Sequence, residues 1–117
     1  MKIAVDVMGT DYGPSEIIKG ALQAVKAYGL DVVLVGDQDV IKKELGKEQE
    51  ENNPHVYIHH ASQVIEMKDH PGISVRKKKD ASIVVATRLL REKECDALIS
   101  SGSTGAAVAA ALFGLGR

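Results

Sequence analysis

Apolar residues along this chain form short compact blocks, separated by longer stretches in which they recur every three or four positions. The blocks lie at residues 2–7, 32–36, 55–60 and 96–100. Blocks of this length that are apolar on both faces are typical of strands buried inside a parallel sheet. We therefore expect four strands.

Between these blocks, apolar residues recur at the spacing of a helix. One helix is expected from Pro14, which suits a first helical position, to the natural stop at Gly29. Asp37 or Asp39 is a candidate cap for a short helix through Leu45. The other helices are expected after residues 80–82, with Asp80 or Ser82 as cap, and from Thr104 onward, whereas residues 46–54 and the segment containing residues 70–72 are predicted as loops.

Strands that alternate with helices predict an α/β fold. We expect a three-layer, Rossmann-like, doubly wound sheet that is mainly parallel, with helices on both faces. Glycine-rich turns follow the first and fourth expected strands, in "MGTDYG" (8–13) and "SGSTG" (101–105). Ligands of such folds gather beyond the carboxyl ends of the strands, so these two turns are the best structural indication of a site.

Composition narrows the class of protein. The 117 residues suit a single domain, residues 1–117, and the net charge of -1 argues against general binding to nucleic acid. The single cysteine, Cys95, permits no intramolecular disulfide, which favours a cytoplasmic location. No signal peptide is predicted, and the longest apolar stretch, 105–116, is shorter than the roughly 20 residues that span a bilayer.

The stretch "SSGSTGAA" joins the fourth expected strand to the last helix. Glycine backbone and the positive end of a helix can cradle phosphate or another oxyanion. Neither the dinucleotide nor the P-loop spacing is present, and an ordinary capped helix with small packing residues remains the alternative. The residues of this candidate cradle are Ser100, Gly102, Ser103, Thr104 and Gly105.

Two carboxylates flank the first turn. Asp6 ends the first expected strand and Asp11 lies in the loop after it, so both could face one crevice and orient substrate or exchange protons. The alternative is structural: Asp6 satisfies loop N–H groups, and Asp11 caps the helix at Pro14.

Four consecutive cations, residues 76–79, stand near an expected helix start, where the helix dipole disfavours them. They could meet a phosphate, a phosphopantetheine arm or an acidic carrier protein, or they could be a solvated face. The histidines predict no metal site, because His59 and His60 would point to opposite faces of a strand. No nucleophile elbow for a Ser-His-Asp triad is present.

Three motifs together resemble one family, the bacterial phosphate acyltransferases of phospholipid synthesis (the PlsX family). "IAVDVMGTDYGP", "VIEMKDHPGISVRKKKDASIVVA" and "CDALISSGSTGA" resemble its three N-terminal signatures, in order and over nearly the whole chain. Thr10 and Ser103 replace a glycine and an asparagine that are usual in the family.

The resemblance implies transfer of a fatty acyl group from acyl carrier protein to inorganic phosphate, giving acyl phosphate without a cofactor or metal. It implies catalytic roles around Asp6, Asp11, Ser103 and Thr104. Phosphate or substrate binding would fall to Gly9, Arg76, Lys78, Lys79, Ser100, Gly102 and Gly105. It also implies a homodimer in the cytoplasm, with peripheral membrane association of the full-length protein.

Members of that family are about three times longer, so the chain is expected to correspond to the N-terminal third of a larger fold. Two other functions stay open. One is a phosphotransacylase-like enzyme that uses coenzyme A thioesters, and the other is a non-catalytic α/β fragment or interaction module.

Overall fold

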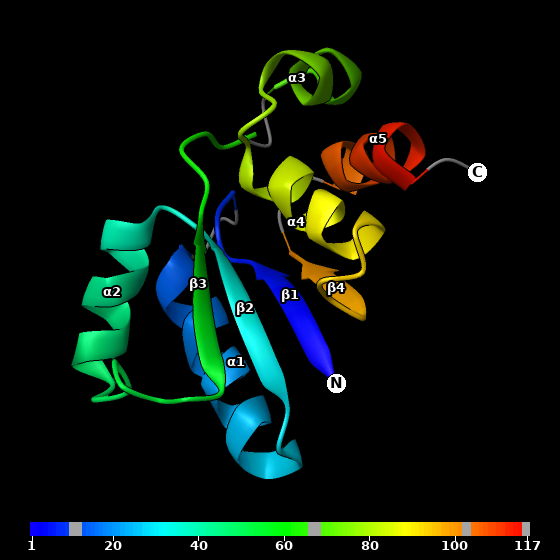
Figure 1. Cartoon of the computed structure of the whole chain (residues 1–117). Helices are drawn as coiled ribbons and strands as arrows, with labels where there is room; N and C mark the ends of the chain where they lie inside the picture. Colours follow the sequence, from blue (N-terminus) through cyan, green and yellow to red (C-terminus); the bar gives the residue numbers. More distant parts are fainter. Residues whose placement is uncertain (10–12, 66–68, 102–103, 116–117) are drawn as a thin grey trace.

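The computed structural model describes residues 1–9, 13–65, 69–101 and 104–115, apart from the side chains of Thr104 and Phe113. Figure 1 shows a parallel sheet between two layers of helices. The elements are, in chain order, β1 (Lys2–Asp6), α1 (Pro14–Tyr28), β2 (Asp31–Gly36), α2 (Gln38–Lys47), β3 (Val56–His60), α3 (Pro71–Lys77), α4 (Ser82–Arg91), β4 (Ala97–Ser100) and α5 (Thr104–Leu115).

The strand order is β3-β2-β1-β4, and all three pairings are parallel. The chain therefore runs outward from β1 to β3 and then crosses back to place β4 on the other side of β1. The topological switch point of the sheet therefore lies at the carboxyl ends of β1 and β4. Ligands of doubly wound folds bind at this point. The predicted α/β class and parallel sheet are confirmed.

Alternating strand residues build a separate core on each face of the sheet. Val5 and Leu34 pack with α1 and α2, whereas Ala4, Val33 and Val35 pack with α4. α5 does not complete the second layer over the sheet; it packs mainly on α3 and α4 (Figure 1). Burial on both faces explains why the strands read as nearly continuous apolar blocks in the sequence.

Both ends of α1 and the start of α2 lie at the residues that the sequence predicts. Pro14 is the first residue of α1, and Gly29 ends that helix in the left-handed conformation at φ 65°. Asp37 caps α2 through Oδ1, which accepts from the N–H groups of Asp39 and Val40 at 2.9 and 3.3 Å. These ends follow from residue type alone.

The segment around residues 70–72 corrects two expectations. It was predicted as a loop, but His70 caps α3 by accepting from the Ile73 N–H, and Pro71 is its first residue. Arg76 and Lys77 therefore stand in the last turn of α3, where the helix dipole favours cations. Lys78 and Lys79 follow α3 and precede the start of α4 at Ser82, near the helix start that was expected. The expected cap of α4 was also wrong, since Ala81 occupies that position without a side-chain hydrogen bond.

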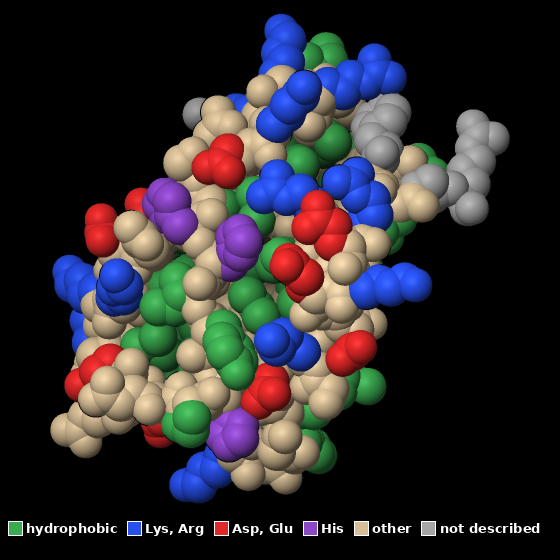
Figure 2. Space-filling model, in the orientation of Figure 1, with side chains coloured by type: hydrophobic (Ala, Val, Ile, Leu, Met, Phe, Trp, Pro, Cys, Tyr) green, Lys and Arg blue, Asp and Glu red, His purple; other side chains and the backbone are tan. Residues whose placement is uncertain are grey.

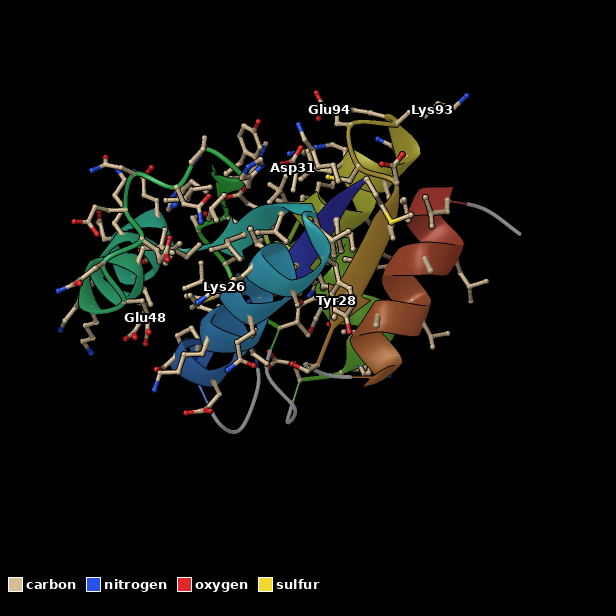
Figure 3. The ribbon with its side chains drawn as sticks, turned by 90° about the horizontal axis from the view of Figure 1, so that it is seen from below. Lys26, Tyr28, Asp31, Glu48, Lys93 and Glu94 are labelled. Atoms are coloured by element: carbon tan, nitrogen blue, oxygen red, sulfur yellow. The ribbon has the colours of Figure 1, made fainter. Side chains whose placement is uncertain are left out.

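The amino ends of the strands form the opposite edge of the sheet. Figure 3 views the molecule from below, with Asp31 at the start of β2 and Lys26 and Tyr28 at the end of α1. His55 Nδ1 lies 2.8 Å from Asp31 Oδ1, in an exposed pair. In the described part of the chain, no helix is both long and apolar enough to cross a membrane.

Candidate active site at the carboxyl edge of the sheet

Asp6 lies at the switch point and is 3% exposed. β1 and β4 place Asp6 and Ser100 as register partners at their carboxyl ends, and Ser100 Oγ donates to Asp6 Oδ2 at 3.2 Å. The Met8 N–H donates to Asp6 Oδ1 at 3.2 Å, and the buried Ser82 hydroxyl, at the first residue of α4, supplies another hydrogen bond. One carboxylate thus ties together β1, β4, the turn after β1 and the start of α4.

Burial raises the pKa of the Asp6 carboxyl above its ordinary value of 3.8, and the hydrogen bonds from Ser82, Met8 and Ser100 oppose that rise. All three of these donors are neutral groups, and their hydrogen bonds offset only part of the cost of desolvating the charge. A buried ionisable group of this kind, at the switch point of a doubly wound sheet, indicates a functional site.

The structure supports the structural interpretation of Asp6, because its carboxylate accepts from a loop N–H, that of Met8. A role in orienting substrate or exchanging protons stays a prediction. Ser82 was considered only as a helix cap, and its contact with Asp6 was missed. The two residues are far apart in the sequence, and only the crossover from β3 to β4 brings them together.

Gly9 lets the turn after β1 approach the segment that follows β3. Its φ is +77°, and a Cβ placed on it would lie 3.0 Å from the backbone carbonyl oxygen of Ile65. A larger residue would be strained in that conformation and would push the two segments apart. Gly9 therefore holds the turn after β1 close to the segment that follows β3. Its predicted part in binding phosphate or substrate stays a prediction.

Gly105 has a packing role, in agreement with the alternative of small packing residues, but its partner in α3 was not predicted. A Cβ on Gly105 would lie 2.6 Å from Cγ of Pro71, so a glycine is needed for the first turn of α5 to abut the start of α3. This contact holds the amino ends of two helices together at the carboxyl edge of the sheet. Binding of phosphate by the backbone around Gly105 stays a prediction.

Lys78 is already engaged within the chain. Its Nζ donates to the Val64 carbonyl at 3.0 Å and to Asp69 Oδ2 at 3.1 Å, and so ties the end of α3 to the segments on either side of residues 66–68. A role in positioning these segments is visible. A role for Lys78 in binding phosphate or substrate remains a prediction.

Arg76 and Lys79 face a different part of the molecule. They line a cavity on the outer side of α4 together with Arg88 and Arg91, and neither Asp6 nor Ser100 is among the described residues of its wall. The basic run thus splits, because Lys78 contacts the segments on either side of residues 66–68, whereas Arg76 and Lys79 line this cavity.

Three predicted site residues, Asp11, Gly102 and Ser103, lie outside the described residues, as does the side chain of Thr104. The backbone at Thr104 begins α5, so the positive end of a 12-residue helix stands next in the chain to β4. Among the described residues, no group of three or more His, Cys, Asp or Glu could hold a metal ion.

Comparison with known proteins covers the whole chain. A family model described as "Fatty acid synthesis protein" matches residues 1–117. A phosphate acyltransferase from Pelotomaculum thermopropionicum is 56% identical over 117 residues, which are all of this chain and 34% of that protein. Proteins of the same name from Desulfitobacterium hafniense and Dictyoglomus turgidum are 54% and 50% identical over the same length. The chain thus spans about a third of the length of these relatives.

Proposed function

This chain belongs to the fatty acid synthesis protein family, whose relatives are named phosphate acyltransferases, and on that premise we propose that it forms part of such an enzyme. The complete enzyme moves a fatty acyl group from acyl carrier protein to inorganic phosphate and releases acyl phosphate. A phosphate oxygen attacks the thioester carbonyl carbon, the carbon–sulfur bond breaks, and the thiol leaves with a proton.

This reaction needs no covalent intermediate with the protein. Phosphate is its own nucleophile, so the enzyme has to hold a dianion beside a thioester and stabilise the developing oxyanion. The positive end of α5 beside the carboxyl end of β4 suits both tasks. No cofactor or metal enters this proposal.

The observation that carries the proposal is the buried Asp6 at the switch point, with Ser100 and Ser82 hydrogen bonded to it. We assign Asp6 a positioning role, because its carboxylate fixes the turn after β1, the start of α4 and the end of β4 relative to one another. Misplacing such groups by about 1 Å can cost about a hundredfold in rate.

The test uses a chimaera in which this chain replaces the matching first third of the Pelotomaculum relative. Acyl phosphate formation is measured with long-chain acyl carrier protein and phosphate. Asp6→Asn is expected to lower kcat by about a hundredfold. The matched control, Asp39→Asn at an exposed position on α2, should leave the rate unchanged.

Two outcomes would overturn parts of the proposal. Faster reaction with coenzyme A thioesters than with carrier-protein thioesters would favour the phosphotransacylase-like alternative. An inactive but folded chimaera would favour a non-catalytic module. A homodimer in the cytoplasm, with peripheral membrane association, belongs to the same proposal and is checked by sedimentation and vesicle binding of the complete protein.

A further inference from the structure

A cavity of about 480 Å³ lies on the outer side of α4, away from the carboxyl-edge site. α3 and α4 each pack on α5, and residues of all three helices form its wall. This volume falls in the range of sites that hold small molecules. The described lining residues are Val75, Arg76, Lys79, Val84, Thr87, Arg88, Arg91, Ala110 and Gly114.

Four of these residues are cations, and none of the described lining residues is acidic. Arg76 and Lys79 come from α3 and the turn after it, whereas Arg88 and Arg91 lie one turn apart on α4. Figure 2 shows Lys and Arg side chains gathered in the upper part of the view, over α3 and α4. Cations brought together from two elements favour an anionic ligand.

Within the described part of the chain, carboxylates neutralise Arg88 and Arg91 only weakly. Arg91 Nη2 lies 4.0 Å from Glu92 Oε1, but both side chains are about half exposed, and such pairs contribute little. Arg88 is the smallest of the influences on the pKa of Asp80, whose carboxylate mainly accepts from the backbone N–H and hydroxyl of Ser62. The two arginines therefore keep donors to offer to a ligand.

The remaining wall of the cavity is apolar. Val75, Val84, Ala110 and Gly114 carry no polar side-chain atoms. Thr87, the one described lining residue with a hydroxyl, donates it to the Ile83 carbonyl at 2.8 Å within α4. The cavity thus combines a cationic group of side chains with a surface that favours hydrocarbon.

We propose that this cavity binds a soluble amphipathic anion, with a phosphate-type head group held by Lys79, Arg88 and Arg91 and an apolar part against Val84 and Ala110. Guanidinium groups suit the head, because they bind phosphate oxygens in pairs. The proposal does not depend on acyl transfer at the carboxyl-edge site, and either one can fail alone.

The experiment is calorimetric titration of the chain with hexyl phosphate, and with hexanol and inorganic phosphate as the separated halves of that probe. Hexyl phosphate is expected to bind at one site, at least about tenfold more tightly than either half. The double variant Arg88→Gln/Arg91→Gln should weaken binding by about tenfold or more. The matched control, Lys42→Gln/Lys43→Gln at exposed positions on α2, should bind as the unaltered chain does.

Amide chemical shifts locate the site and guard against a folding defect. Titration should move the signals of Val84, Thr87 and Ala110, while circular dichroism of the variants stays unchanged. Equal affinity of the arginine variant and the unaltered chain would overturn the proposal. So would binding to vesicles of phosphatidylcholine and phosphatidic acid without any binding of hexyl phosphate, because a membrane surface would then be the ligand.

Discussion

A single buried carboxylate makes stability depend on pH in a direction opposite to that of most acidic residues. The pKa of Asp6 is raised in the folded chain by burial, so the folded state holds its proton to higher pH than the unfolded state does. Stability from this group is therefore highest below the ordinary value of 3.8 and falls as pH rises through the folded pKa.

Asp6→Asn should remove this fall. In urea unfolding between about pH 3.5 and about pH 7.5, the free energy of unfolding of the variant is expected to rise relative to that of the unaltered chain and then to differ from it by a constant amount. A relative fall with rising pH would contradict the raised pKa. Asp39→Asn, on exposed α2, serves as the control.

Glycines in helices offer a second test at the residue scale. Gly105→Ala places a methyl group 2.6 Å from Pro71 Cγ, and we expect it to destabilise the fold by about 1–3 kcal/mol. Gly20→Ala in α1 meets no atom within 4 Å, and helix propensity predicts that it stabilises by up to about 1 kcal/mol. Urea midpoints of the two variants should thus move in opposite directions.

Lys78 acts at the scale of elements, because it joins the end of α3 to Val64 and Asp69. Lys78→Met is expected to cost only about 0.5 kcal/mol, since the side chain is partly exposed to solvent. Faster hydrogen exchange should nevertheless appear in residues 61–65 and 69–81. Lys77→Met, at the exposed last residue of α3, should leave exchange in these residues unchanged.

The sequence predicts some helices and strands of this fold but not others. All four strands and the ends of α1 follow from apolar blocks, Pro14 and Gly29, because these signals act over a few residues. α3 was missed because its cap is a histidine and its 7 residues carry only one buried side chain, Val75. Asp6 could be picked out as a candidate from its place at a strand end. Its partner Ser82 could not, because that contact depends on the crossover.

The described sheet has two edge strands, β3 and β4, and the β4 side also carries exposed apolar side chains on the strand and on α5. Among the described strands, β4 pairs only with β1, and Ile99 on β4 is 54% exposed. α5 exposes Val108, Leu112 and Leu115. An edge strand beside exposed apolar side chains favours pairing with another chain.

We therefore expect the 117-residue chain to self-associate as its concentration rises. Ile99→Lys should weaken the association by placing a charge on the open strand. Ile73→Lys is the matched control, because Ile73 is 50% exposed but lies on α3. Sedimentation that finds only monomers at high concentration, or equal effects of the two variants, would contradict this expectation.

The central position of β1 has a consequence for synthesis on the ribosome. β2 and β3 can join β1 as soon as they emerge, and α1 and α2 then complete one of the two cores. The bonds from Ser82 and Ser100 to Asp6 must await a crossover and a strand made much later. Until α4 and β4 are made, the face of the sheet that carries Asp6 is uncovered, so the step that buries this carboxylate is also the step that supplies its Ser82 and Ser100 donors.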